Sequence, residues 1–300
     1  MPWHLLFPLF SSLVFVLGML WGKRAISAGV RPWTSTFLSN AWLAVAWSAV
    51  GLGQPDWLPM EAWGQATLVG LAFVCGQMFS FLAFQHGDVS VATPIFGVKV
   101  IMVALLLALL GDEPVEGRIW AGAILATVGV GVMQVGGRST SHGQLTWFRA
   151  VATIVLALLS ALSLSLFDVG LQLWGRRWGA NQFLPVAFAA GGLLSCGFLP
   201  WCDRPQRIRE LGVSFPLGVG TFLIALQAVS MSFSLGHFGD ATRINIVYAL
   251  RGLWAVGLAW LLARSMGTAE AHVPPRIMGL RLLGAVLLTA AVLVALFPGD

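Results

Sequence analysis

The sequence predicts an all-α integral membrane protein with ten transmembrane helices, arranged as two inverted repeats of five helices each. Three observations predict this class. Hydrophobic residues make up 58% and charged residues 10% of the 300-residue chain, whereas a typical soluble domain has roughly 25% charged residues. Apolar runs of the roughly 20 residues needed to cross a bilayer core recur along the chain. The pattern of the first half also returns in the second, where Arg251 stands 152 positions after Lys99.

Ten segments match the transmembrane template, and short connections rich in glycine, proline and charge separate them. No basic residue precedes the first segment and Lys23 and Arg24 follow it, so we expect a retained helix rather than a cleavable signal peptide. The third and fourth segments are separated only at Gly87–Asp88. In order, the predicted helices are Leu5–Gly22, Trp33–Gly53, Ala62–Gln85, Val89–Leu110, Ile119–Val135, Ala150–Leu173, Phe183–Trp201, Phe215–Leu235, Ile244–Leu262 and Met278–Phe297. Glycines expected to allow close helix packing are Gly18, Gly22, Gly122, Gly129 and Gly131.

A polar stretch near the middle of the chain, Gly136–Gln144, divides these helices into two sets of five. We therefore predict a first five-helix repeat over residues 1–137, a linker over 138–144 and a second repeat over 145–300. Because five is odd, the second repeat enters the membrane from the face opposite to the first. In transporters, inverted repeats of this kind hold the substrate near the bilayer midplane, where the copies meet.

Several side chains recur at matching places in the two repeats. The segment AGAILAT from Ala121 corresponds to LGAVLLT from Leu283. The separation of matched residues changes only at connections, as expected after a duplication followed by small insertions. The other matched pairs are Gln77 with Gln227, Ser80 with Ser230, Phe96 with Tyr248, and Lys99 with Arg251.

The formal net charge of +5 does not indicate a nucleic-acid partner, because the basic residues form short clusters between apolar runs. The positive-inside rule produces this pattern. Most of the clusters fall on one side of the predicted topology, which we expect to be cytoplasmic, and both termini then lie outside. The basic residues of that side are Lys23, Arg24, Arg31, Arg138, Arg149, Arg204, Arg207, Arg209, Arg264 and Arg276.

Lys99 and Arg251 are the principal candidates for a binding site. Lys99 lies about 15 Å from either end of its predicted helix, at 1.5 Å per residue, and a charge at that depth costs on the order of 2.5–3.5 kcal/mol. Two interpretations stay open: each cation forms a structural ion pair, or both face a water-filled cavity that accepts an anionic group. Asp168 is the only acid well inside a predicted span. Because it can neutralise only one cation, we favour the cavity.

Neighbours on the same helix faces extend this candidate site. Phe96 lies three residues before Lys99, and Tyr248 lies three residues before Arg251, so each cation shares a helix face with an aromatic ring. Tyr248 either hydrogen-bonds the substrate or stacks within the bundle. Asn245, three residues earlier on that face, is a polar residue suited to lining the cavity.

Four further polar residues are candidates for substrate binding. Thr93 precedes Lys99 within the same predicted helix. Gln77 and Gln227 occupy matching places in the two repeats, where they either line the cavity or hold helices together. Asp168 pairs with a cation, carries a proton or stays solvated near its helix end; the sequence leaves these roles open.

Three stretches carry a resemblance to a known family: FGVKVIMVALLLALLGDEPVEGRIWAGAILATVGV from Phe96, LWGKRAISAGVRP, and its later counterpart LWGRRWGANQFLP. With them the chain resembles the drug/metabolite transporter superfamily, in particular ten-helix members built from two EamA-type repeats. In the second half, ARSMGTAEAHVPP replaces the compact turn of the first. The resemblance implies a secondary carrier with a central cavity walled by helices one, three, four, six, eight and nine. It also implies cytoplasmic termini, opposite to the loop-charge count.

The resemblance bears on the two cations as well. Plastid sugar-phosphate translocators of this superfamily hold phosphate with basic residues on helices four and nine, and Lys99 and Arg251 are similar in position. This chain has one basic residue at each place and lacks a paired Lys-Arg on helix nine, so the resemblance does not fix phosphate as the substrate.

We therefore predict a secondary transporter that moves a small anionic or zwitterionic metabolite, a carboxylate or phosphate ester, by alternating access. Lys99 and Arg251 hold the substrate at midmembrane. The alternative is a flippase for a lipid-linked phosphate. A membrane-embedded lipid-modifying enzyme is disfavoured because the sequence lacks clustered acids or His/Asp groups, so we expect no catalytic residue, metal or cofactor. The expected partners are the substrate and membrane lipid, and the expected location is the bacterial cytoplasmic (inner) membrane.

Overall fold

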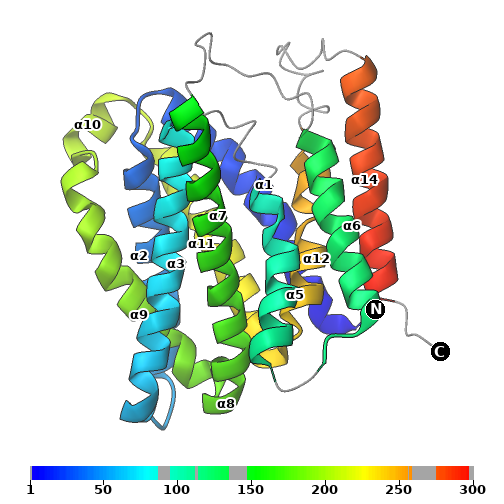
Figure 1. The fold of residues 1–300 in the computed structure, drawn as a ribbon. Coiled ribbons are helices and arrows are strands. Elements are labelled where there is room, and N and C mark those ends of the chain that lie inside the picture. The colour runs from blue at the N-terminus through cyan, green and yellow to red at the C-terminus, as the bar shows by residue number, and fades with distance from the viewer. Residues whose placement is uncertain are drawn as a thin grey trace. The chain divides into compact units, whose positions relative to one another are not determined.

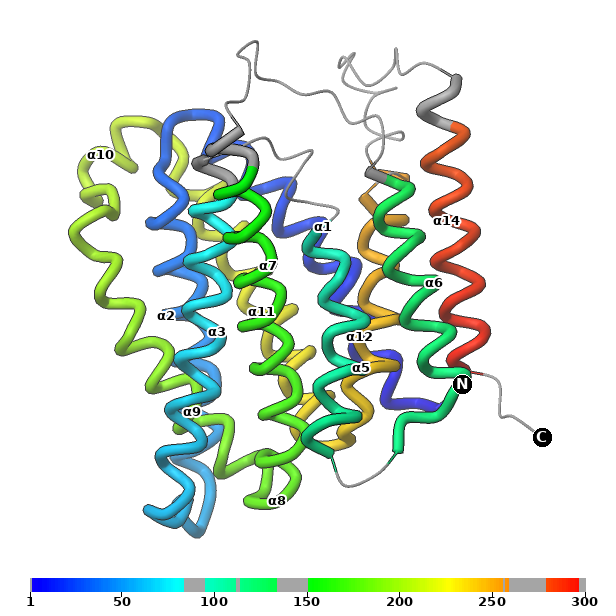
Figure 2. The backbone as a smooth tube through the Cα atoms, in the orientation of Figure 1, coloured from blue at the N-terminus to red at the C-terminus, as the bar shows by residue number. Residues whose placement is uncertain are grey.

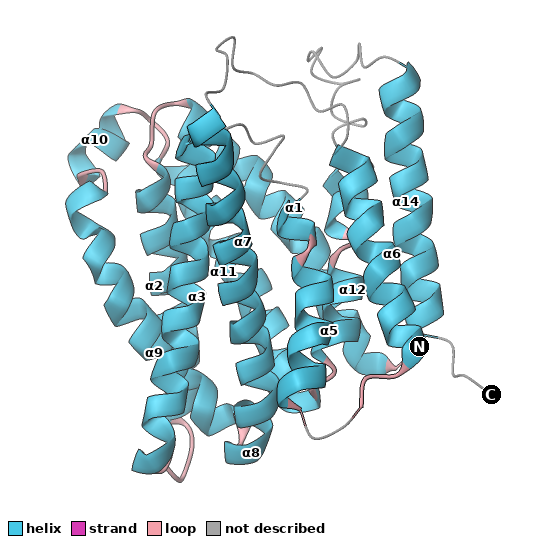
Figure 3. Ribbon diagram, in the orientation of Figure 1, coloured by secondary structure: helices cyan, strands magenta, loops and turns pink. Residues whose placement is uncertain are grey.

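The computed structural model describes residues 2–86, 95–111, 114–134, 147–255, 257–258 and 275–296. Within these ranges the chain forms only helices and loops (Figure 3), which confirms the predicted all-helical class. Every predicted span overlaps a helix. The helices labelled in Figure 1 are α1 Leu6–Ser27, α2 Pro32–Leu52, α3 Met60–His86, α5 Lys99–Leu110, α6 Gly117–Gln134, α7 Trp147–Gly170, α8 Arg176–Trp178, α9 Ala180–Ser195, α10 Pro205–Glu210, α11 Ser214–Phe238, α12 Ala241–Tyr248 and α14 Pro275–Leu296. Three short elements complete them: η1 Trp3–Leu5, the π-helix η2 Leu171–Gly175 and η3 Cys196–Trp201.

Six helical stretches of the described chain are long and apolar enough to cross a membrane. Two shorter apolar helices, Ile95–Leu110 and Gly117–Met133, accompany them. The predicted second and ninth spans are helical as α2 and α12, but they belong to neither group. Ten crossings therefore stay a prediction. The six long stretches are Trp3–Ser27, Met60–Ala83, Val151–Trp178, Ala180–Trp201, Ser214–Phe238 and Gly279–Leu296.

The chain folds into two compact units, and each unit takes segments from both halves of the sequence. Unit 1 comprises Met1–Leu5, Met78–Ser165 and Ala241–Asp300, whereas unit 2 comprises Leu6–Gln77 and Leu166–Asp240. The predicted repeats, 1–137 and 145–300, cut across this division and stay predictions. The predicted linker, 138–144, lies outside the described residues.

Unit 2 is held by close approach of its long helices, which Figure 2 traces along the chain. Helix α1 packs along α11, and α2 packs along α9 and α11. A Cβ atom at Gly220 of α11 would lie 2.7 Å from the backbone nitrogen of Gly22 in α1, whereas a Cβ at Gly22 would meet no atom within 4 Å. The close contact therefore requires the glycine at 220, and the prediction that Gly22 itself permits it is wrong. Between α2 and α11, the indole of Trp47 donates a 3.2 Å hydrogen bond to Ser232 Oγ.

Unit 1 contains an antiparallel contact between α6 and α14, which lie side by side in Figure 1. A Cβ atom at Gly122 would lie 3.2 Å from the carbonyl oxygen of Ala291, and one at Gly284 would lie 2.7 Å from that of Gly129. Gly284 and Ala291 follow Gly122 and Gly129 by the same 162 positions. Each residue of the Gly122–Ala291 contact therefore has its repeat counterpart in the Gly284–Gly129 contact. Gly131 has no atom within 4 Å of such a Cβ. Its predicted packing role is wrong because it lies off the contact face.

Candidate functional site

Both candidate cations lie directly after an interruption of their helices in unit 1. Helix α5 begins at Lys99, and a turn at Val98 separates it from the helical residues 95–97. Helix α12 ends at Tyr248, and the helix resumes at Arg251 after a turn at 249–250. The separation of 152 positions that relates Lys99 to Arg251 therefore also relates the turn before Lys99 to the turn before Arg251.

One hydroxyl group from another helix bonds the backbone just before the interruption at Val98. Thr127 Oγ1 of α6 donates a 3.4 Å hydrogen bond to the carbonyl oxygen of Gly97. Ser165 Oγ of α7 lies 2.7 Å from the carbonyl oxygen of Ala161 in its own helix and 3.3 Å from that of Lys99, so its closer contact is within α7.

Both cations stand on packed segments of unit 1. Helices α5 and α12 pack against each other. Lys99 is the first residue of α5, and Arg251 follows the end of α12 by three residues. Basic side chains on packed segments favour an anionic ligand.

The structure orients Arg251 through the aromatic ring three residues before it. The Arg251 guanidinium carbon lies 4.5 Å from the centre of the Tyr248 ring, a cation–π contact. Tyr248 is 8% exposed, so its ring forms a largely buried support for the guanidinium. The two roles predicted for Tyr248, a hydrogen bond to the substrate or stacking against Trp254, stay predictions.

The other unit 1 candidates are less accessible. Asn245 is 2% exposed, and its Nδ2 donates a 2.9 Å hydrogen bond to Ala241 O of its own helix. Phe96 packs against the buried cluster of Ala83 and Ala157. Thr93 lies outside the described residues. Lining of a cavity by these residues stays a prediction.

Gln77 belongs to unit 2 and is part of a hydrogen-bonded amide pair. Asn40 Nδ2 donates to Gln77 Oε1 at 2.8 Å, and Gln77 Nε2 donates to Asn40 Oδ1 at 3.1 Å. Asn40 Nδ2 also lies 3.2 Å from Ser195 Oγ. The network joins α2, α3 and α9, as expected of an amide that holds helices together.

We expect Asn40→Ala and Gln77→Ala each to lower the free energy of unfolding by about 1–3 kcal/mol, because each removes both hydrogen bonds of the amide pair. The double variant should cost less than the sum of the two single costs. Denaturant titration in detergent measures these costs, and the transport KM should stay within about twofold of the wild type if the pair is structural. A KM that rises tenfold in Gln77→Ala with unchanged stability would instead place Gln77 at the substrate.

Asp168 and Gln227 also lie in unit 2. Asp168 is 1% exposed on α7, three residues before the first residue of the π-helix η2, Leu171. Short π segments within helices occur frequently at functional sites. Gln227 is half-buried on α11, and its carbonyl oxygen accepts a 3.2 Å hydrogen bond from Ser11 Oγ. Their contact with substrate stays a prediction.

Arg243 is a basic residue of α12 that the sequence did not single out. Its Nε donates a 3.0 Å hydrogen bond to Ala295 O near the end of α14, and its Nη2 lies 3.9 Å from Glu116 Oε1. Glu116 also pairs with Arg118. The hydrogen bond from Arg118 lowers the pKa of Glu116, and the charges of Arg118 and Arg243 lower it further. Arg243 precedes the predicted span by one residue, which explains why it was overlooked.

Two further features bear on possible ligands. An apolar cavity of about 440 Å³ lies between α1 and α11. In the part of the chain that the structure describes, no three His, Cys, Asp or Glu side chains are grouped so as to hold a metal ion. The cavity is lined by Leu6, Phe7, Phe10, Leu226, Val229, Ser230 and Phe233.

Comparison with known proteins supports the resemblance found in the sequence. Residues 1–134 match the model of the EamA-like transporter family. The resemblance to the drug/metabolite transporter superfamily is thereby confirmed, and the apolar helices indicate an integral membrane protein.

Two relatives and one solved structure resemble this chain. A "Probable 4-amino-4-deoxy-L-arabinose-phosphoundecaprenol flippase subunit ArnE" of Pseudomonas savastanoi pv. phaseolicola is 29% identical over 142 residues, which cover 45% of this chain and 97% of the relative. The protein of the same name from Pseudomonas syringae pv. syringae is 29% identical over 128 residues, covering 42% of this chain and 94% of the relative. A crystal structure with 20% identity shares the fold, with a TM-score of 0.69 over 98% of this chain and 96% of its own.

Proposed function

We propose that this protein is a secondary transporter for a substrate with an anionic phosphate or carboxylate group, held by Lys99 and Arg251. The observation that carries this proposal is the repeated arrangement in unit 1. On each of two packed helices, one cation follows a helix interruption at the matching place. A guanidinium binds a phosphate or carboxylate through two parallel hydrogen bonds, and an ammonium adds a compact point charge.

We propose alternating access between two inverted five-helix repeats as the transport mechanism. The exchangeable contacts between α6 and α14 support this proposal, because reversal of residue order along the two helices is the relation expected between inverted copies. The relatives support it too, since almost their full length aligns with less than half of this chain. A half-length relative corresponds to one repeat.

Two substrate classes fit the anion-binding arrangement. The first is a small anionic or zwitterionic metabolite in water, the class predicted from the sequence. The second is a lipid-linked phosphate, and the names of both Pseudomonas relatives favour this class because each is a flippase subunit for an aminosugar linked through phosphate to a lipid. In both classes the two cations would hold the phosphate or carboxylate. We place the protein in the bacterial inner membrane, where lipid-linked phosphates cross.

A thermal-shift screen of the purified protein in detergent tests the proposal. The compounds are undecaprenyl phosphate, water-soluble sugar phosphates, dicarboxylates and lipophilic cations. We expect stabilisation by at least one anionic class, by about 2.7 kcal/mol at 100 times its Kd. Undecaprenyl phosphate alone would assign the lipid-linked class, and soluble anions alone the metabolite class. Stabilisation by cations but by no anion would contradict the proposed function.

A further inference from the structure

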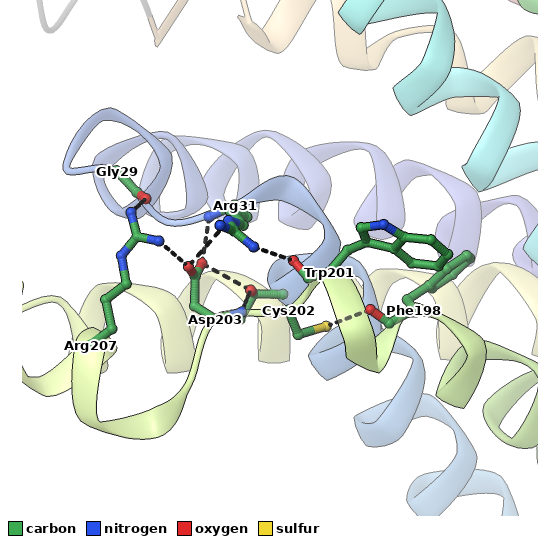
Figure 4. A network of polar contacts seen from close by, with 8 residues as sticks. Gly29, Arg31, Phe198, Trp201, Cys202, Asp203 and Arg207 are labelled. Atoms are coloured by element: carbon green, nitrogen blue, oxygen red, sulfur yellow. Dashed lines mark hydrogen bonds and ion pairs between the residues drawn. The ribbon is translucent and has the colours of Figure 1, made fainter.

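Two neighbouring segments of unit 2, residues 23–31 and 204–209, carry six basic residues, and two of these contact a buried carboxylate. We call this set the basic face, and its members are Lys23, Arg24, Arg31, Arg204, Arg207 and Arg209. At its centre the Asp203 side chain is 0% exposed, and Figure 4 shows Arg31 and Arg207 directed at it from two sides. Arg207 Nη1 lies 2.9 Å and Arg31 Nε 3.7 Å from Asp203 Oδ1. Both distances are those of ion pairs, but neither guanidinium is oriented so as to donate a hydrogen bond to Oδ1.

The second oxygen of Asp203 fixes the backbone of this region. Asp203 Oδ2 accepts hydrogen bonds from the Arg31 backbone N–H at 2.7 Å and from Thr34 Oγ1 at 3.0 Å, and Thr34 Oγ1 accepts the Asp203 N–H at 2.7 Å. Arg207 Nη2 also donates to Gly29 O at 3.3 Å. The turn before α2 is thus tied to the turn before α10.

Apolar packing holds α10 beneath its arginines. Ala25 and Val30, from the α1–α2 region, form a buried cluster with Val213 and Leu217. Ile208 and Leu211 pack against that cluster. Arg204, Arg207 and Arg209 are exposed on the same short segment. The arginines are therefore presented from an anchored helix rather than from a free loop.

Aromatic rings next to the basic face set its depth in the membrane. The Arg24 guanidinium lies 4.7 Å from the centre of the Trp21 ring, and Trp21 packs edge-on against Phe215 at 5.7 Å. Trp33 and Trp201 have ring centres 6.2 Å apart. Tryptophan is enriched where lipid headgroups meet the hydrocarbon core. The adjoining guanidinium groups then lie at the level of the lipid phosphates.

We propose that the basic face is a built binding site for the phosphate of an anionic phospholipid headgroup. The charges favour an anion, because only Asp203 and Glu210 among the surrounding residues 23–34 and 201–212 are acidic, and Asp203 is already engaged by two arginines. Arg31 and Arg207 are 53% and 47% exposed in their side chains. Each can thus hold Asp203 and still face a headgroup. This proposal shares no residue with the Lys99 and Arg251 site and does not depend on the transported substrate.

Native mass spectrometry of the delipidated full-length protein, titrated with phosphatidylglycerol or phosphatidylcholine, tests the proposal. We expect tighter binding of phosphatidylglycerol. The double variant Arg204→Gln/Arg209→Gln should weaken that binding by roughly 30-fold, about fivefold for each cation near a lipid surface, and leave phosphatidylcholine unchanged. The matched control is Arg176→Gln/Arg177→Gln in α8, which removes two exposed arginines from the opposite end of α9 and should change neither lipid.

Asp203→Asn distinguishes a built site from diffuse charge. This variant makes the region more positive, so diffuse attraction predicts tighter phosphatidylglycerol binding. A built site predicts weaker binding, because Arg31 and Arg207 lose the carboxylate that positions them. Tighter binding in Asp203→Asn would overturn the proposal, and so would equal losses in the α8 control and the Arg204/Arg209 variant. If Asp203→Asn does not fold, the comparison of the two double variants decides alone.

Discussion

Lys99→Gln and Arg251→Gln should each lower kcat/KM for the anionic substrate by roughly 30-fold to more than 1,000-fold in reconstituted vesicles. The physical reason is that truncating one member of a desolvated charge pair costs about 2–5 kcal/mol, much of it the penalty of leaving the other charge unpaired. Because glutamine keeps polarity and approximate length, the loss reports charge rather than volume. Uptake of labelled substrate at several concentrations measures the ratio.

The conservative exchanges separate the roles of the two cations. Arg251→Lys removes the planar fork and its stacking on Tyr248, so it should recover only part of the activity, whereas Lys99→Arg should recover more. The control is Arg243→Gln on the same helix α12, whose side chain pairs with Glu116 and Ala295 O. It should affect stability and leave KM unchanged. If Lys99→Gln and Arg251→Gln transport normally, or lose stability in proportion to transport, both cations are structural.

The helical segments could be predicted from the sequence because apolar runs of membrane length leave few alternatives for the backbone. The exact place of the interruption before Lys99 could not. Pro94 favours a kink in this segment, but the turn falls four residues later, at Val98. There Thr127, from a different helix, bonds the carbonyl of Gly97, and a local pattern does not contain that contact.

For the side chains of the candidate site, too, the sequence does not reveal contacts between different helices. The repeat identified Lys99 and Arg251 because a duplicated charge at depth is conspicuous, and the spacing also placed Tyr248 on the face of Arg251. For Gln77 the sequence left two roles open, since the deciding partner, Asn40, lies in a different helix. Asn40 is itself a polar amide in a predicted span, and that signal would have paired it with Gln77.

Gly284→Ala should lower the free energy of unfolding by about 1–3 kcal/mol, the usual cost of forcing extra volume into a packed contact. The added Cβ would lie 2.5 Å from Met133 Cγ, 2.7 Å from Gly129 O and 2.9 Å from Met133 N. The methionine side chain can move, but the two backbone atoms cannot unless α6 and α14 separate. Gly284→Leu should prevent recovery of folded protein. Denaturation in detergent and fluorescence-detected size exclusion measure these outcomes.

Gly131→Ala is the matched control, because it adds the same methyl group to α6 at a position with no atom within 4 Å. It should be neutral or stabilise by up to about 1 kcal/mol, since glycine is a poor helix former. Gly122→Ala tests the exchangeable contact, with Ala291 O 3.2 Å from its Cβ. If one substitution moves α6 and α14 apart, the second methyl group meets less crowding. Gly122→Ala/Gly284→Ala should therefore lower the free energy of unfolding by less than the sum of the two single effects. If the cost of the double variant equals the sum of the two single costs, the two contacts are energetically independent. That result would contradict a single α6–α14 contact shared by two related repeats.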